Sequence, residues 1–322
     1  MNCARSSKRS RLAAPALTTP NHPIRTTMSI TRNYTFPLIA NIFHPTDFSE
    51  ASRTAFHHAL RAALIAKSGF TLLHVANGDE REVIDFPGVR ETLERWGILP
   101  KDSPRSAVPQ LGIGVKKIIA SPSEPVASVL RYLEEHPADL IVLATHHHEG
   151  RVAWMSHSVA SPIARRSGEM TLLIPEGDAG FVSAEDGSVS LKNVLIPVAE
   201  SPTPQSAVEA AARLVSRLEC PGGTFTLLHV GDARSMPEVQ TPEVAGWEWK
   251  TATRPGDVIQ GIVDAADEMD ADLVVMSTDG RSGFLEALRG SHTERVLQQV
   301  HAPLLAVPEH SIAEQRLTSE IQ

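Results

Sequence analysis

The residues best suited to hold a phosphate group lie near the end of the chain. Gly280 is followed, after nine residues, by Gly290-Ser291, and Arg281 and Arg289 lie between them. Glycine leaves the backbone open to close approach, and the free N–H groups at the start of a helix attract anions. The spacing therefore favours a phosphate site, although the S-x-x-E pattern that begins at Ser291 is also a capping box that needs no ligand.

Histidines form a second group, concentrated in the first half of the chain, where nine of the 14 lie between His44 and His157. Neutral imidazoles that converge on one point are good ligands for zinc, nickel or copper. The histidines that we considered as metal ligands are His44, His146, His147, His148 and His157. Adjacent histidines on a loop diverge as often as they converge, and no cysteine or well-spaced carboxylate completes the set. We therefore expect no metal.

Composition narrows the class of protein. The net charge is −8, and the acidic balance argues against nucleic-acid binding. No apolar run approaches the roughly 18–20 residues of a membrane span, so we expect no membrane partner. The two cysteines, Cys3 and Cys220, form no C-x-x-C pair, which fits a reducing cytoplasm.

An internal repeat sets the organisation of the chain. The sequence FTLLHV occurs at residues 70–75 and again at residues 225–230, and ADLIVLAT at 138–145 corresponds to ADLVVMST at 271–278. Self-similarity of this length indicates a tandem duplication. His74 and His229, inside the repeated strand, are interpreted as hydrogen-bonded structural residues rather than ligands.

Each half alternates short apolar runs with amphipathic segments, as β-α-β units do. In the first half we expect strands near residues 38–44, 69–75, 114–120, 139–145 and 170–174, and helices near 49–67, 88–97, 123–136 and 158–167. In the second half we expect strands near 192–197, 224–230, 247–253, 272–277 and 303–307, and helices near 203–218, 256–269 and 291–300. The segment between the second and third strands of the second half is short and contains prolines, so we expect a loop there.

The predicted fold class is α/β, with two tandem Rossmann-like domains, each a five-stranded mostly parallel sheet flanked by helices. The expected bounds are 34–176 for the first domain, 177–191 for a linker of turn residues, 192–309 for the second domain and 310–322 for a tail. Residues 1–33 are expected to be disordered or a mis-assigned extension, with Met28 as the preferred start, because five bases and no acid precede it.

The glycine segment resembles the nucleotide-binding loop of the universal stress protein family, written G-x2-G-x9-G-[S/T]. Gly280 and Gly290-Ser291 match this pattern, whereas Ser277 stands at its first glycine. HPTDFS at residues 44–49, the repeated LLHV and the final LLAVP at residues 304–308 extend the resemblance over nearly the whole chain from residue 38 to residue 309. The resemblance implies binding of ATP or another adenine nucleotide.

Residue by residue, the resemblance assigns different parts of a site to the two halves. In the second half it assigns Val230, Ser277, Gly280, Arg281, Gly290, Ser291 and His292, but the adenosine-binding Asp falls on Ala199, with Glu200 next to it. In the first half it assigns, more weakly, Asp47, Val75 and Ser158, while the three glycine positions read Ala144, His147 and His157. We therefore expect binding in the second half and little or none in the first.

The resemblance implies a cytoplasmic stress-response regulator rather than an enzyme, with slow ATP hydrolysis left open. It also implies that the two domains pair through TLLIP and LLAVP as an internal pseudo-dimer, which could dimerise again. The alternatives are an adenine-nucleotide hydrolase or transferase on the same scaffold, a metal-binding stress protein that uses the first-domain histidines, and an interaction protein with two inactive sites. No HIGH-like, SGGxDS-like or GxxxxGK[ST] pattern supports the enzymes.

Overall fold

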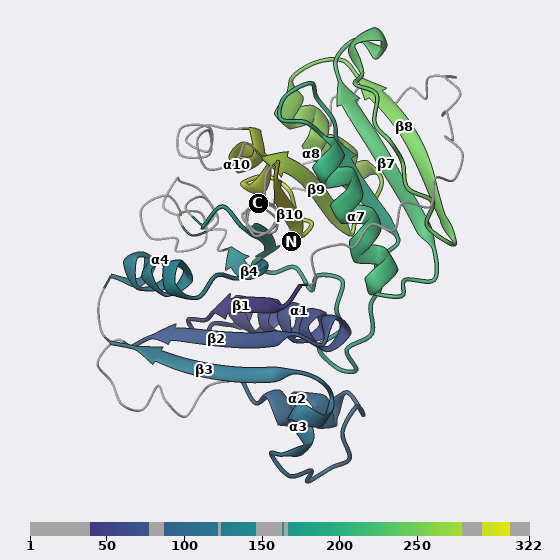
Figure 1. Cartoon of the computed structure of the whole chain (residues 1–322). Helices are drawn as coiled ribbons and strands as arrows, with labels where there is room; N and C mark the ends of the chain where they lie inside the picture. Colours follow the sequence, from purple (N-terminus) through teal and green to yellow (C-terminus); the bar gives the residue numbers. More distant parts are fainter. Residues whose placement is uncertain are drawn as a thin grey trace, which may run out of the picture.

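The computed structural model describes residues 39–76, 87–121, 124–145, 163, 167–278 and 292–309. Ten strands form one sheet in the order β3-β2-β1-β4-β5-β10-β9-β6-β7-β8, so the two predicted five-stranded sheets are joined into one (Figure 1). Strands within each half are parallel, whereas β5 and β10 at the junction are antiparallel. The predicted α/β fold is confirmed, and the pairing of TLLIP with LLAVP is present.

The elements of the two halves follow the same order, with one exception. The first half contains β1 (Asn41–Pro45), α1 (Glu50–Ala66), β2 (Gly69–Val75), α2 (Val89–Arg95), α3 (Ala107–Gln110), β3 (Gly114–Ala120), α4 (Pro125–Glu135), β4 (Leu140–Thr145) and β5 (Met170–Pro175). The second contains β6 (Asn193–Pro197), α7 (Gln205–Arg217), β7 (Gly223–Val230), η2 (Ala233–Ser235), β8 (Trp247–Arg254), α8 (Val258–Glu268), β9 (Leu273–Thr278), α10 (His292–Leu297) and β10 (Leu304–Pro308). The predicted helix at 158–167 lies almost wholly outside the described residues.

The exception is the crossover from β7 to β8, which holds only the 3-10 turn η2, as expected from its prolines. Two tryptophans of β8 cover the sheet there. Trp247 and Trp249 lie with ring centroids 4.6 and 4.1 Å from that of Phe225. Such aromatic contacts bury large apolar areas, so they replace the packing that a helix would supply. The short helix α3 was not predicted.

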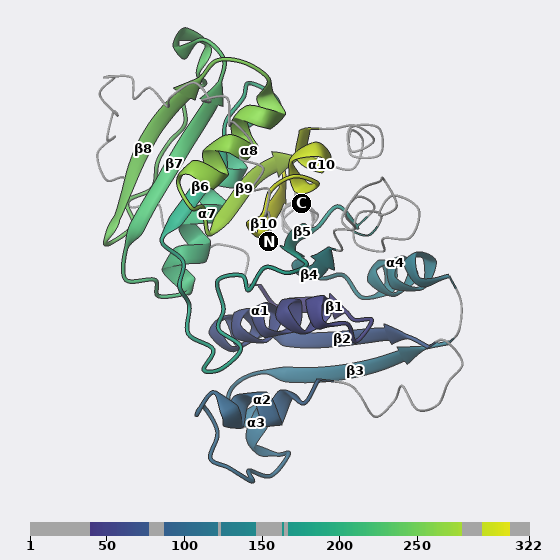
Figure 2. The ribbon, with the colours of Figure 1, turned by 180° about the vertical axis from the view of Figure 1, so that it is seen from behind.

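Helices cover both faces of the sheet, and each face has a continuous apolar core (Figures 1 and 2). Successive strand residues point to opposite faces. Thus Val194 belongs to the cluster on the side of α1 and α7, whereas Leu195 belongs to the cluster on the side of α4 and α8; both are 0% exposed. Each cluster contains residues of both halves. The repeated apolar runs are therefore strands buried on both sides, as the sequence predicted.

The repeated Ala-Asp-Leu sequence has a structural function in both halves. Asp139 Oδ2 accepts hydrogen bonds from the backbone N–H groups of Ala40 and Asn41 at 2.9 and 2.8 Å. Asp272 Oδ2 does the same for the two residues at the start of β6, at 2.8 and 2.7 Å. Hydrogen bonds to a carboxylate are stronger than those between neutral groups. Each aspartate therefore fixes the start of the first strand of its repeat.

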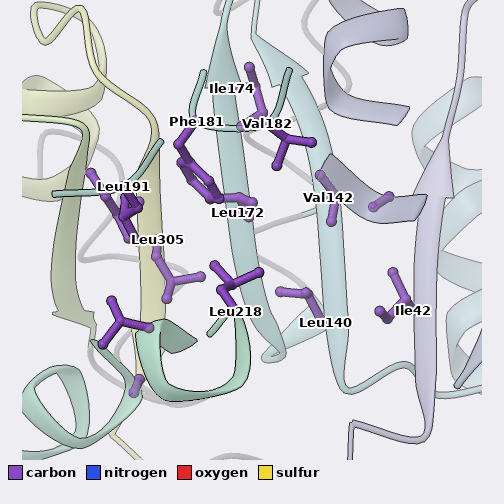
Figure 3. Packing of buried hydrophobic residues seen from close by; sticks show 14 of the residues in the cluster. Ile42, Leu140, Val142, Leu172, Ile174, Phe181, Val182, Leu191, Leu218 and Leu305 are labelled. Atoms are coloured by element: carbon purple, nitrogen blue, oxygen red, sulfur yellow. The ribbon is translucent and has the colours of Figure 1, made fainter. Parts of the chain in front are cut away.

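The segment between the repeats is more than the linker of turn residues that the sequence predicted. Residues 177–191 form a hairpin closed by an antiparallel bridge between Val182 and Val189. Phe181 and Val182 are only 2% and 3% exposed, and they lie over β5 beside Leu172 and Ile174 (Figure 3). We call residues 177–191 the inter-repeat hairpin. The sequence did not indicate the hairpin, because two apolar residues among glycines and acids give no periodic signal.

Candidate functional site

The candidate site of the second repeat lies at the carboxyl ends of its parallel strands. Ligands of open α/β sheets bind at this edge, where the strand order reverses. In this repeat the order reverses between β6 and β9, the neighbouring strands whose connections run to opposite sides. Val230 ends β7, Ser277 is the last residue but one of β9, and His292 opens α10. The topology therefore brings the described members of the predicted site to one end of the repeat.

Val230 is fixed by close packing against α8. A Cβ atom at Gly261 of α8 would lie 3.0 and 3.1 Å from the two methyl groups of Val230, tighter than nearly all real contacts. The next residue, Gly231, donates its backbone N–H to the carbonyl oxygen of Arg254 at 2.9 Å. The backbone at the end of β7 is thus held on two sides.

Ser277 occupies the position of the first family glycine, and its side chain turns away into the protein. Its hydroxyl lies 3.0 Å from that of Ser206 in the first turn of α7, and the residue is 9% exposed. The extra atoms are therefore accommodated by a partner on the neighbouring helix. The other members of the predicted site, Gly280, Arg281, Gly290 and Ser291, lie outside the described residues.

The segment that follows β6 carries no aspartate to replace the missing one. Ala199 and Glu200 are both exposed, directly after Val198, whose N–H donates to Leu228 at 2.8 Å. The nearest carboxylate in the sequence is that of Glu200. The second repeat therefore has no aspartate after its first strand, as the sequence indicated.

Two charged residues near this edge were missed by sequence reasoning. Arg254, at the end of β8, is 1% exposed; it donates a hydrogen bond to Glu268 and lies 3.5 Å from Asp264, both on α8. Asp257 caps α8, and its pKa is lowered by the backbone N–H of Gln260 and, to a smaller extent, by Arg295 and His292. Of the two, only Arg254 gave a possible signal, because it is a charged residue at the end of a predicted strand. Arginine is rarely buried unless it is paired.

In the first repeat, Asp47 is exposed but engaged locally. Its Oδ1 atom accepts hydrogen bonds from the backbone N–H of Ser49 at 3.0 Å and from the Ser49 hydroxyl at 2.6 Å, which shapes the turn before α1. Phe48 stacks on the imidazole of His74 with centroids 4.1 Å apart. Val75 ends β2, as predicted, and Ser158 lies outside the described residues.

The repeated histidines are structural, as the sequence predicted. His74 Nδ1 lies 2.8 Å from the carbonyl oxygen of Thr46, and His229 Nδ1 lies 3.0 Å from that of Val198. Each ring therefore joins the end of the second strand to the end of the first. His229 Nε2 also lies 2.9 Å from the Ser235 hydroxyl.

His44, one of the histidines that we weighed as a metal ligand, is a core residue. It is 0% exposed, and its Nδ1 atom lies 2.9 Å from the carbonyl oxygen of Val142. Burial lowers the pKa of His44 to about 4, so the ring is neutral at pH 7. Among the described residues no group of three or more histidines, cysteines or acids could hold a metal ion. His146, His147, His148 and His157 lie outside them.

Comparisons with known proteins agree with this architecture. The model of the family described as the universal stress protein family matches residues 39–175 and 245–308. The chain is 24% identical over 262 residues to universal stress protein Rv2005c of Mycobacterium tuberculosis, which covers 73% of this chain and 85% of that protein. It is 46% identical over 46 residues, 14% of this chain, to universal stress protein MJ0531 of Methanocaldococcus jannaschii, of which 27% is covered.

The fold also resembles a crystal structure of a universal stress protein from Archaeoglobus fulgidus, with a TM-score of 0.55 and 17% identity over 83% of this chain and 96% of that one. This likeness extends over both repeats. The chain belongs to the universal stress protein family. Within the part of the chain that the structure describes, every helix is too short or too polar to cross a membrane.

Proposed function

We propose that this chain is a nucleotide-responsive stress regulator that binds ATP or another adenine nucleotide through its second repeat. The observation that carries the proposal is the location of the two elements between which the glycine segment runs in the sequence. Residues 279–291, with Gly280 and Gly290-Ser291, connect Thr278 at the end of β9 to His292 at the start of α10. This is the edge of the sheet where ligands of α/β folds bind.

Contacts at the end of β7 support an adenosine site at this edge of the sheet. The end of β7 at Val230 is held by Gly261 and Arg254, so its backbone is preorganised to meet a base. Rigid backbone groups lose little entropy on binding. Because Ala199 stands where the family has an aspartate, we expect a lower affinity for the adenosine part of the nucleotide.

We expect little nucleotide binding in the first repeat. Imidazole-bearing residues His147 and His157 stand where the family has glycines, and a Cβ restricts both space and backbone dihedral angles. Asp47 already accepts two hydrogen bonds from Ser49. We therefore assign regulation, in a cytoplasmic setting and without catalytic turnover, to nucleotide occupancy of the second repeat.

The binding test compares the whole protein with a Gly280→Val/Gly290→Val variant by calorimetric titration of ATP, ADP and AMP. The variant should bind at least about tenfold more weakly, which corresponds to about 1.4 kcal/mol. Gly114→Val is the matched control, because a Cβ at Gly114 meets nothing within 4 Å. Unchanged ATP affinity in the double variant would refute the assignment.

A second measurement addresses turnover and identity of the ligand. Nucleotide released from the purified protein is identified by mass spectrometry, and phosphate release is followed with excess ATP. A regulator should co-purify with or bind adenine nucleotide while releasing phosphate far more slowly than the roughly 1–10³ per second of typical enzymes. Turnover in that range would favour the hydrolase alternative.

A further inference from the structure

His58 joins α1 to the inter-repeat hairpin through both of its ring nitrogens. The Nδ1 atom lies 2.8 Å from the carbonyl oxygen of Thr54 and donates to it. The Nε2 atom must then be an acceptor, and it receives the backbone N–H groups of Phe181 at 3.0 Å and Val182 at 3.2 Å. One neutral tautomer therefore satisfies three backbone groups, two of them on the hairpin.

Steric contacts fit the hairpin closely to this ring. Gly180 has a φ of 65°, and a Cβ there would overlap the His58 imidazole. The Phe181 ring meets the imidazole edge-on, with centroids 4.6 Å apart. On the other arm, Trp96 Nε1 donates to the carbonyl oxygen of Ala184 at 3.2 Å. The hairpin is thus held at two points, one of which can be protonated.

The docked hairpin covers the junction between the repeats. Phe181 and Val182 belong to the same apolar cluster as Leu172 of β5 and Leu305 of β10, the two strands that join the halves (Figure 3). Removing the hairpin would expose these side chains to water at a cost of about 25 cal/mol for each Å² of apolar surface. Its docking therefore controls whether the junction is covered.

We propose that His58 is an acid-sensitive latch: protonation of its ring releases the inter-repeat hairpin and uncovers the β5–β10 junction. An imidazolium carries a proton on both nitrogens, so Nε2 would face the N–H groups of Phe181 and Val182 with no lone pair to offer. The inference is independent of nucleotide binding.

The titratable and charged groups around the ring do not all act in the same direction. Burial, as the largest cause, and the neighbouring His57 lower the pKa of His58 to about 4. The pKa of His57 is also lowered to about 4, by burial and then by Arg95, which lies 3.0 Å from its Nε2 atom. Asp178 on the hairpin acts in the opposite direction: it accepts the N–H of Gly180, and burial raises the pKa of its carboxyl group, so this group favours docking as the pH falls.

The sign of the effect follows from linkage. The docked pKa of about 4 lies below the ordinary value of 6.5, so the undocked state binds more protons and docking weakens as the pH falls from about 6.5 towards 4. Between pH 7 and pH 5 the ratio of docked to undocked hairpin should fall roughly 20-fold.

Hydrogen–deuterium exchange of the whole chain, read by mass spectrometry and normalised to the unfolded chain at each pH, measures this ratio. Peptides that cover residues 177–191 should lose roughly 20-fold protection between pH 7 and pH 5, while those of β7 at residues 223–230 should change far less. His58→Gln keeps an acceptor that does not titrate, so its hairpin should stay protected at pH 5. His136→Gln, an exposed histidine, is the matched control and should behave as wild type.

Two outcomes would overturn the latch: an equal loss of protection in His58→Gln, or no loss in the wild type at pH 5. Gly180→Ala provides a test at pH 7, because its Cβ should displace the hairpin from the ring and lower protection without acid. In a His58→Ala background the same glycine substitution should cost much less protection, since the ring is gone. An additive loss in the double variant would contradict the contact, and circular dichroism verifies that each variant is folded.

Discussion

Leu305 of β10 lies opposite Leu172 of β5, in the antiparallel pair that converts two parallel sheets into one. Both side chains are buried, and both belong to the apolar cluster that runs through the two repeats. The repeats therefore share a core as well as a backbone ladder. A substitution at either leucine should therefore change the stability of both repeats.

Leu172→Ala is expected to lower the free energy of unfolding by about 2–5 kcal/mol, because it removes buried methyl groups and leaves a cavity. Wild-type unfolding in urea, followed by circular dichroism, should be one transition, since each core cluster contains both halves. Ile119→Ala, at a side chain that is 44% exposed, should change stability by less than about 0.5 kcal/mol. Two separate wild-type transitions would argue against a shared core.

Ser277→Gly should raise the affinity for ATP about three- to tenfold if the second repeat binds nucleotide, because glycine at this position frees the backbone before the glycine segment. It should also lower stability by about 1 kcal/mol through loss of the hydroxyl pair with Ser206. Ser206→Ala breaks the same pair without changing that backbone, so it should lose stability with little change in affinity. Equal affinities in all three proteins would contradict a role for Ser277.

His44→Ile should make stability less dependent on pH. The second repeat has Ile196 at the same position of the strand, so the substitution fits the fold. The folded pKa of His44 is about 4, below the ordinary 6.5, so the wild type loses stability as the pH falls through this window. From this group alone the loss between pH 7 and pH 5 should be about 2 kcal/mol, and the variant should lack it.

The check on this prediction is urea unfolding of both proteins at the two pH values. His136→Gln, which changes an exposed histidine, should keep the pH dependence of the wild type. If His44→Ile loses as much stability on acidification as the wild type does, the buried ring is not the group that titrates.

Glu268→Gln should be more damaging than Arg254→Met. The first change weakens the main partner of a guanidinium that is 1% exposed, which should cost about 1–3 kcal/mol because Glu268 itself is partly solvated. The second removes the buried charge and leaves two carboxylates that water can reach, so it should cost about 1 kcal/mol or less. Thermal unfolding of the two variants compares them directly, and the reverse order would contradict this account.

Much of the fold could be predicted because its signals are local or repeated. The strands at residues 69–75 and 114–120 have the predicted bounds, and the duplicated Ala-Asp-Leu sequence leads into β4 and β9 at corresponding places in the two halves. The inter-repeat hairpin could not be predicted, since its partner His58 is 123 residues from Phe181 in the sequence. The hairpin sequence has no apolar periodicity that would indicate this contact.

Some features of the candidate site could be predicted from the sequence, and others could not. The ends of strands follow from apolar runs, so Val230 and Ser277 lie where the sequence placed them. The direction of the Ser277 side chain did not follow, because it depends on Ser206 across the packed interface. The glycine positions outside the described residues remain predictions from spacing and from the family resemblance.

Pairing β5 with β10 inside one polypeptide has a consequence for how the two copies can change. In a dimer of identical subunits, dilution separates the partners, and every substitution appears twice across the interface. Here a short tether holds the partners at an effective concentration that the cell cannot lower. At this junction each copy therefore meets the other, so a substitution in one copy is not repeated across the interface, and the two copies can carry different residues there.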